Sequence, residues 1–127
     1  MRVLVVEDSD TMANLITTIC KKVGVEAYSV ADGGKAVEVY NKIRPQLVIS
    51  DLMLPGLTGP ELMRKILITN PGQKVIYISG FSEMPRFREW LSREQQRGKD
   101  AVFIQKPFEL AAFQRTIRSM LDLPSVD

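Results

Sequence analysis

The chain has 127 residues, a length typical of one globular domain, and we expect residues 1–127 to form a single domain. Apolar residues make up 45% and charged residues 25%, which excludes a disordered or fibrous chain. The formal net charge of +2 gives no electrostatic reason to expect nucleic-acid contact. Histidine is absent, which excludes Ser-His-Asp and Cys-His catalysis and His-ligated metals.

Cysteine content and hydropathy indicate the compartment. Cys20 is the only cysteine, so the chain cannot form an internal disulfide, as is usual in a reducing environment. No apolar run approaches the roughly 18 residues of a membrane span, and the run at residues 3–6 is too short for a signal peptide. We therefore expect a cytoplasmic protein with no membrane contact.

Short apolar runs alternate with stretches of helical periodicity along the whole chain. In chain order we expect a strand at 3–6, a helix at 12–23, a strand at 25–30, a helix at 36–43, a strand at 47–50, a helix at 58–67, a strand at 75–79, a helix at 87–94, a strand at 102–104 and a helix at 110–121. The apolar runs are typical of strands buried on both faces. Thr58 and Glu61 have the spacing of a capping box, with Pro60 in the first turn of that helix.

Five β-α units in succession predict an α/β fold with a parallel sheet, right-handed crossovers and helices on both faces. In such sheets, binding sites form at the carboxyl edge of the strands. The side chains expected to meet there are three carboxylates, one hydroxyl and one amine, on Glu7, Asp8, Asp51, Ser79 and Lys106.

Three carboxylates at one edge repel each other unless a cation offsets them. Because the ligands are all oxygens, Mg²⁺ is the ion expected. A simpler reading makes Glu7 and Asp8 a helix N-cap and Asp51 a turn residue before Pro55. The alternative for Asp51 is nucleophilic attack on phosphorus beside a bound metal, which gives an aspartyl phosphate. The isomer of the Lys106-Pro107 bond is left open.

Four segments, MRVLVVEDS, LVISDLMLPGLTGPEL, VIYISG and FIQKPF, resemble the receiver domain of response regulators in two-component signalling. The resemblance covers essentially the whole chain and implies a flavodoxin-like (βα)5 doubly wound parallel sheet with strand order 2-1-3-4-5. It further implies that Mg²⁺ is held by Glu7, Asp8, Asp51 and the backbone carbonyl of Met53. The implied phosphoacceptor is Asp51, assisted by Ser79 and Lys106, and the implied switch residues are Ser79 and Phe103.

The resemblance also implies partners. A histidine kinase or histidine phosphotransfer domain would donate the phosphoryl group, and a downstream protein or attached effector would respond at the surface of the fourth helix, fifth strand and fifth helix. A homodimer is compatible with it. However, 26 residues separate Ser79 from Lys106, more than is usual in the family, and the excess falls around the fourth helix. In that segment we expect Trp90 in the core and charged residues, including Glu94 and Arg97, on a solvated helix face.

Three other functions remain as alternatives. A Mg²⁺-dependent phosphohydrolase with an aspartyl nucleophile would need an acid two residues beyond Asp51, where Met53 stands. A flavin or nucleotide binder would need a glycine-rich loop after the first strand, where acids stand. A pseudo-receiver that acts without phosphorylation would normally lack one of the site residues, and none is lacking. We therefore expect a phosphoaccepting switch instead of an enzyme with turnover.

Overall fold

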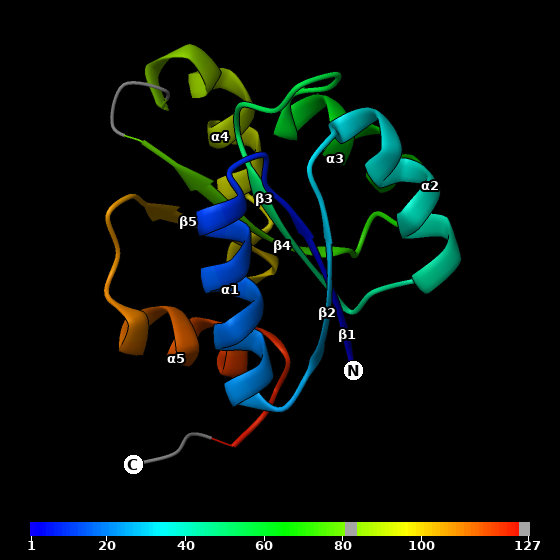
Figure 1. Ribbon diagram of the computed structural model, residues 1–127. Coiled ribbons are helices and arrows are strands. Elements are labelled where there is room, and N and C mark those ends of the chain that lie inside the picture. The colour runs from blue at the N-terminus through cyan, green and yellow to red at the C-terminus, as the bar shows by residue number, and fades with distance from the viewer. Residues whose placement is uncertain (81–83, 125–127) are drawn as a thin grey trace.

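The computed structural model describes residues 1–80 and 84–124, which fold around one five-stranded sheet (Figure 1). Every strand pair is parallel, and the order is β2-β1-β3-β4-β5, as predicted. The strands are β1 (Arg2–Val6), β2 (Glu26–Val30), β3 (Leu47–Asp51), β4 (Lys74–Ser79) and β5 (Ala101–Gln105). The helices are α1 (Asp10–Val23), α2 (Gly33–Ile43), α3 (Gly59–Thr69), η1 (Met84–Phe87), α4 (Arg88–Gln95), η2 (Gly98–Asp100) and α5 (Leu110–Met120).

The helices form two layers, one on each face of the sheet. Helices α1 and α5 pack on one face, nearest the viewer in Figure 1, where Ile16 and Phe113 lie fully buried against Val5. Helices α2, α3 and α4 cover the other face, where Tyr40 and Leu91 pack in one cluster with other buried side chains. The sheet is thus covered on both faces, as its apolar strands require.

Burial differs along the sheet. All five residues of β3 are buried, because this strand lies at the centre of the sheet. Residues 102–104 of β5 are only half-buried. The expectation that this strand is buried on both faces was therefore wrong, because β5 lies at the edge of the sheet.

The predicted capping box is present and brings α3 against the end of β3. The N–H of Glu61 donates to Thr58 Oγ1 at 3.2 Å, and Glu61 Oε1 accepts from the N–H of Thr58 at 3.3 Å. One residue later, the N–H of Gly59 donates to the carbonyl of Leu52 at 2.9 Å. The start of α3 therefore contacts the backbone that immediately follows Asp51.

The segment before β5 differs from its prediction. The expected helix at 87–94 is a 3-10 turn, η1, followed by the short helix α4. Glu94 is 3% exposed and forms an ion pair with Arg97 at 2.5 Å, so the prediction of a solvated position was wrong for both residues. Trp90 is half-buried instead of lying in the core.

A buried polar network explains why these charges turn inward. The Tyr77 hydroxyl donates to Glu94 Oε1, and the Trp90 indole N–H donates to the Tyr77 oxygen at 3.0 Å. Arg97 Nη1 donates to the carbonyl of Gln73 at 2.8 Å. The carboxylate of Glu94 is thus satisfied by a hydroxyl and a guanidinium, which a buried carboxylate requires. Among the described helices, none is long and apolar enough to cross a membrane.

Gly59 provides a test of the contact between α3 and the Asp51 backbone. A Cβ at this position would collide with the carbonyl oxygen of Asp51 and lie 3.2 Å from Leu52 Cα. Backbone atoms cannot move aside cheaply, so we expect Gly59→Ala to lower the free energy of unfolding by about 1–3 kcal/mol. Urea unfolding followed by circular dichroism measures this change.

Gly72→Ala is the matched control, because a Cβ there meets nothing within 4 Å. We expect it to change the free energy of unfolding by less than about 1 kcal/mol. Equal effects of the two substitutions would show that α3 does not constrain the backbone after Asp51.

Candidate functional site: a carboxylate cluster at the strand ends

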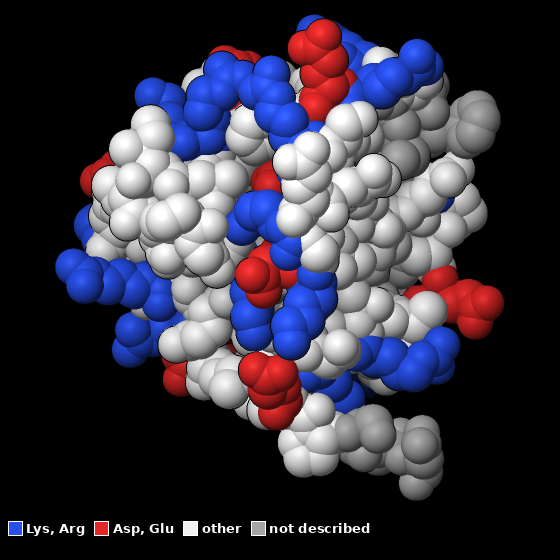
Figure 2. All heavy atoms as spheres, turned by 180° about the vertical axis from the view of Figure 1, so that it is seen from behind, with Lys and Arg blue, Asp and Glu red and all other residues white. Residues whose placement is uncertain are grey.

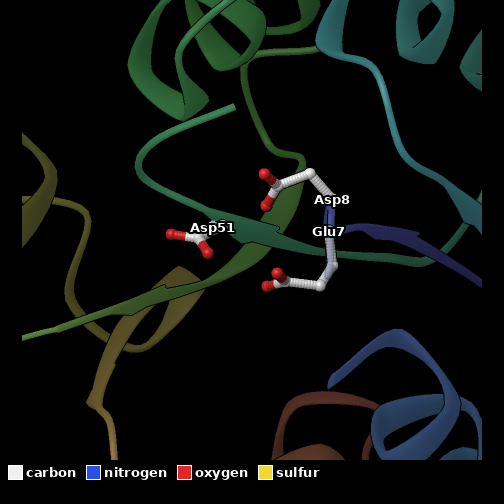
Figure 3. Close-up of side chains that lie close together, drawn as sticks. All are labelled: Glu7, Asp8 and Asp51. Carbon is white, nitrogen blue, oxygen red and sulfur yellow. The ribbon is translucent and has the colours of Figure 1, made fainter. Parts of the chain in front are cut away.

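Three carboxylates meet at the carboxyl edge of β1 and β3 (Figure 3). Glu7 and Asp8 follow β1 directly, and Asp51 is the last residue of β3. Because these strands are adjacent and Val6 pairs with Ser50, the next residue on each strand faces the same site. One oxygen from each carboxylate lies within 4.8 Å of the other two. The structure thus brings the predicted acidic residues together.

Burial makes this cluster electrostatically costly. Glu7 is 3% exposed and Asp51 is 4% exposed, whereas Asp8 is exposed to solvent. Glu7 Oε1 accepts the N–H of Ser9 at 3.1 Å, but Glu7 Oε2 accepts no hydrogen bond from the described residues. The pKa of Glu7 is raised to about 7, mainly because burial disfavours its charged form. The Ser9 N–H lowers this pKa, the Asp51 carboxylate raises it, and the Lys106 ammonium lowers it.

Lys106 supplies the positive charge of the site. Its Nζ donates to Asp51 Oδ2 at 2.8 Å and lies 3.5 Å from Glu7 Oε2. The backbone N–H of Lys106 donates to the carbonyl of Ser79 at 2.8 Å, which fixes its position beside the end of β4. The Lys106–Pro107 peptide bond is cis. One ammonium against three carboxylates leaves an excess of negative charge.

Ser79 and Met53 lie beside the cluster. Ser79 ends β4, the neighbour of β3, and is 3% exposed. No hydrogen bond joins its hydroxyl to the carboxylates within the described part of the chain. The N–H of Met53 donates to Asp51 Oδ1 at 3.3 Å, and its sulfur lies 3.6 Å from Arg86 Nη1. The role of the Met53 carbonyl as a metal ligand stays a prediction.

Phe103 is not part of the cluster. It is half-buried on β5 and stacks on Tyr77 of β4, with ring centroids 5.3 Å apart and an interplanar angle of 13°. Sequence reasoning missed Tyr77, which joins Phe103 to Trp90 and Glu94 of α4. The available signal was a hydroxyl-bearing ring inside an otherwise aliphatic strand, since a buried Tyr normally finds a hydrogen-bond partner.

The residues of the cluster fit a small divalent cation. All the side-chain atoms of the cluster that could bind a metal are oxygens, which suit a hard ion such as Mg²⁺. Two of the carboxylates are buried, and one oxygen, Glu7 Oε2, accepts no hydrogen bond from the described residues. A bound cation would offset the excess negative charge and could coordinate that oxygen, which otherwise faces the Lys106 ammonium at 3.5 Å.

The pKa of Glu7 predicts how stability depends on pH when divalent cations are removed. Its value of about 7 in the folded protein lies above the ordinary 4.5, so the folded protein holds this proton more tightly than the unfolded chain does. The stabilisation is complete below about pH 4.5 and is lost as pH rises through about 7. We expect the free energy of unfolding to fall by about 1–3 kcal/mol over this window.

Urea unfolding in a chelator at several pH values, for the wild type and for Glu7→Gln, isolates this contribution. Glu38→Gln on the surface of α2 is the control and should retain the wild-type pH dependence. The explanation fails if Glu7→Gln loses stability with pH as steeply as the wild type.

Comparison with known proteins agrees with this geometry. The sequence profile of the response regulator receiver domain matches residues 3–118. Sporulation initiation phosphotransferase F of Bacillus subtilis is 25% identical over 98% of this chain and 96% of its own length. Sensor kinase CckA of Brucella abortus is 30% identical over 94% of this chain, which spans 12% of that protein.

A solved structure extends the agreement to three dimensions. The receiver domain of NtrX from Brucella abortus has a TM-score of 0.80 at 27% identity, covering 96% of this chain and 99% of that one. The profile match, the strand order and this likeness establish that the chain belongs to the response regulator receiver domain family of two-component systems.

Proposed function

We propose that Asp51 accepts a phosphoryl group in a Mg²⁺-dependent reaction and that the phosphorylated chain controls a partner. The observation that carries the proposal is the position of Asp51: it is 4% exposed, clustered with two further carboxylates and bonded to Lys106 at 2.8 Å. A structural aspartate would not require two acids and a lysine around it. A nucleophile that receives an anionic group uses such neighbours, because the acids can hold a cation and the lysine can bind the incoming group.

Glu7, Asp8 and Asp51, with the backbone carbonyl of Met53, would hold the ion. When bound, Mg²⁺ supplies positive charge that neutralises phosphoryl oxygens and orients them toward the carboxylate. Glu7 Oε2, which is buried and accepts no hydrogen bond from the described residues, supports this assignment. The ordinary preference of Mg²⁺ for a few carboxylates together with phosphate oxygens is also consistent with it.

The donor in this proposal is a phosphohistidine outside residues 1–127, because this stretch of sequence contains no histidine. A carboxylate oxygen of Asp51 attacks phosphorus and forms the new O–P bond. The N–P bond to the donor imidazole breaks, and the imidazole nitrogen keeps the electron pair and is protonated from solvent. A histidine kinase or a histidine phosphotransfer domain would supply this group, and the likeness to part of a sensor kinase supports such a relay.

Two side chains would respond to the new charge. The Lys106 ammonium, which donates to Asp51 Oδ2 in this structure, would bind a phosphoryl oxygen as a point cation. The Ser79 hydroxyl, which makes no hydrogen bond to the carboxylates within the described residues, would donate to another. A phosphoryl group adds nearly two negative charges, so it favours the conformation that brings both donors close.

The conformational change at the site would reach the protein surface through residues of β4 and β5. Ser79 lies two residues after Tyr77 on β4, and Tyr77 stacks on Phe103 of β5. Movement of Ser79 would therefore act on an aromatic pair that also contacts α4 through Trp90. We propose the surface of α4, β5 and α5 as the surface that changes for a downstream protein or an attached effector.

The phosphohydrolase alternative gains no support from the site. The position that would need an acid is Met53, whose sulfur contacts Arg86 at 3.6 Å. A thioether can neither donate nor accept a proton in the required step. The pseudo-receiver alternative does not explain why buried acids and a lysine are kept together at a cost in electrostatic energy.

Phosphorylation of Asp51 can be tested by intact-protein mass spectrometry after incubation with acetyl phosphate and Mg²⁺. We expect the wild type to gain one phosphoryl group and Asp51→Asn to gain none, because an amide lacks the nucleophilic carboxylate. Omission of Mg²⁺ should strongly reduce uptake by the wild type.

Asp122→Asn is the control, because Asp122 is exposed, pairs only with Lys74 among the described residues, and has a positive φ of 54° that suits Asn. It should be phosphorylated like the wild type. Phosphate uptake by Asp51→Asn at the wild-type level would disprove the proposal.

A further inference from the structure

A groove of about 520 Å³ lies between the start of α3 and the segment formed by η1 and α4. It opens on the face covered by α2, α3 and α4, which Figure 2 shows from behind the sheet. Lys and Arg side chains lie along the middle and upper edge of this face, with Asp and Glu side chains among them (Figure 2). The lengthened segment before β5 builds one wall of the groove. No carboxylate of the cluster lines it, although Arg86 of the lining contacts the Met53 sulfur at 3.6 Å.

The lining of the groove is rich in arginine. Arg64 extends from α3, while Arg86, Arg88 and Arg93 extend from η1 and α4. All four are exposed, and none forms an ion pair with a carboxylate of residues 1–80 or 84–124. The lining also contains Glu61 and Glu89, but Glu61 is engaged in the capping box of α3. With four arginines against two glutamates, the lining carries an excess of positive charge.

Two aromatic rings lie beneath these charges. The Arg64 guanidinium lies 5.6 Å from the centre of the Trp90 ring, and the Arg86 guanidinium lies 5.7 Å from that of Phe87. Both rings are half-buried, and the Trp90 indole N–H is already bonded to Tyr77. What remains available at Trp90 is therefore its apolar ring surface. Trp and Arg side by side form the composition that dominates binding energy at protein interfaces.

We propose that this groove binds an acidic segment of a partner protein, with its carboxylates on the arginines and one apolar side chain against Trp90 and Phe87. Guanidinium groups pair with carboxylates in a two-pronged geometry, which favours Asp and Glu as the recognised residues. The interaction goes beyond the proposed phosphorylation and does not require it.

Other occupants fit less well. A single phosphate would leave most of a 520 Å³ groove and its aromatic rings unfilled. A symmetric contact with a second copy would place the same arginines against each other, which like charges oppose. A nucleic-acid strand would meet Glu61 and Glu89 within the groove, on a chain whose net charge is only +2. Each of these occupants becomes an outcome of the test.

Trp90 is the only tryptophan of the chain, so its fluorescence reports directly on the groove. The probe is a short peptide rich in Asp and Glu with a central Leu-Phe pair, titrated into the whole unphosphorylated chain. We expect a saturable change in Trp90 emission that weakens as salt rises. The same peptide with every acid replaced by its amide should bind at least about tenfold more weakly.

A charge-matched pair of variants tests the location. Arg88→Gln with Arg93→Gln removes two charges from the groove, and Lys21→Gln with Lys22→Gln removes two from the exposed end of α1. We expect the groove variant to lose at least about fivefold in affinity and the α1 variant to stay within about twofold. Arg64→Gln, on the opposite wall of the groove, should also weaken binding. Because this substitution leaves α4 unchanged, it tests the location even if the double variant is unstable.

Several results would overturn the proposal: equal affinity for the amide peptide, equal loss in both double variants, or equally tight binding of inorganic phosphate or a single-stranded oligonucleotide. Concentration-dependent dimerisation in sedimentation that competes with the peptide would assign the groove to a second copy instead. Asp51→Asn should bind the peptide like the wild type, so failure of the phosphorylation proposal and failure of this one give different results.

Discussion

Repulsion among three carboxylates at one edge of the sheet is the constraint on which the rest of the site depends. The parallel order of β1 and β3 places Glu7 and Asp51 side by side, and both are almost fully buried. Lys106 is the cation that bonds to them within the described residues, and it reaches both. A fold that selected only for stability would replace buried like charges with apolar side chains, because an unbalanced buried charge is costly. This electrostatic cost supports the proposal that a cation and an anionic group bind at this edge.

The two faces of the sheet serve different purposes. Helices α1 and α5 pack mainly through apolar side chains, whereas the opposite face carries a buried polar network around Tyr77 and Glu94. This network ties α4 to β4, and through Phe103 to β5, so the position of α4 depends on hydrogen bonds as well as on packing. Polar contacts are directional, so α4 is held in a defined position beside the strand that ends in Ser79.

The sequence predicted the elements whose signals are local. Apolar runs marked the strands, the Thr58–Glu61 pair marked the start of α3, and the acids at strand ends marked the site. It failed where tertiary contacts override local pattern. Glu94 and Arg97 follow the charge alternation typical of a solvated helix, but they pair with each other and also bond to the Tyr77 hydroxyl and the Gln73 carbonyl, which sequence pattern does not reveal. Trp90 lies half-buried because its neighbours form a groove instead of a closed core, and β5 is half-buried because it lies at the sheet edge, which its composition does not reveal.

The affinity for Mg²⁺ in the wild type and in Lys106→Met tests most directly whether carboxylate repulsion governs the site. The ammonium competes with a cation for Asp51 Oδ2 and Glu7 Oε2, and methionine keeps much of the bulk while removing the charge. Isothermal titration or NMR shifts on the whole chain give both affinities, with Lys74→Met, remote from the cluster, as a control. If carboxylate repulsion governs the site, Lys106→Met binds Mg²⁺ several-fold more tightly than the wild type, by about 1 kcal/mol or more. An unchanged or weaker affinity in Lys106→Met would contradict it.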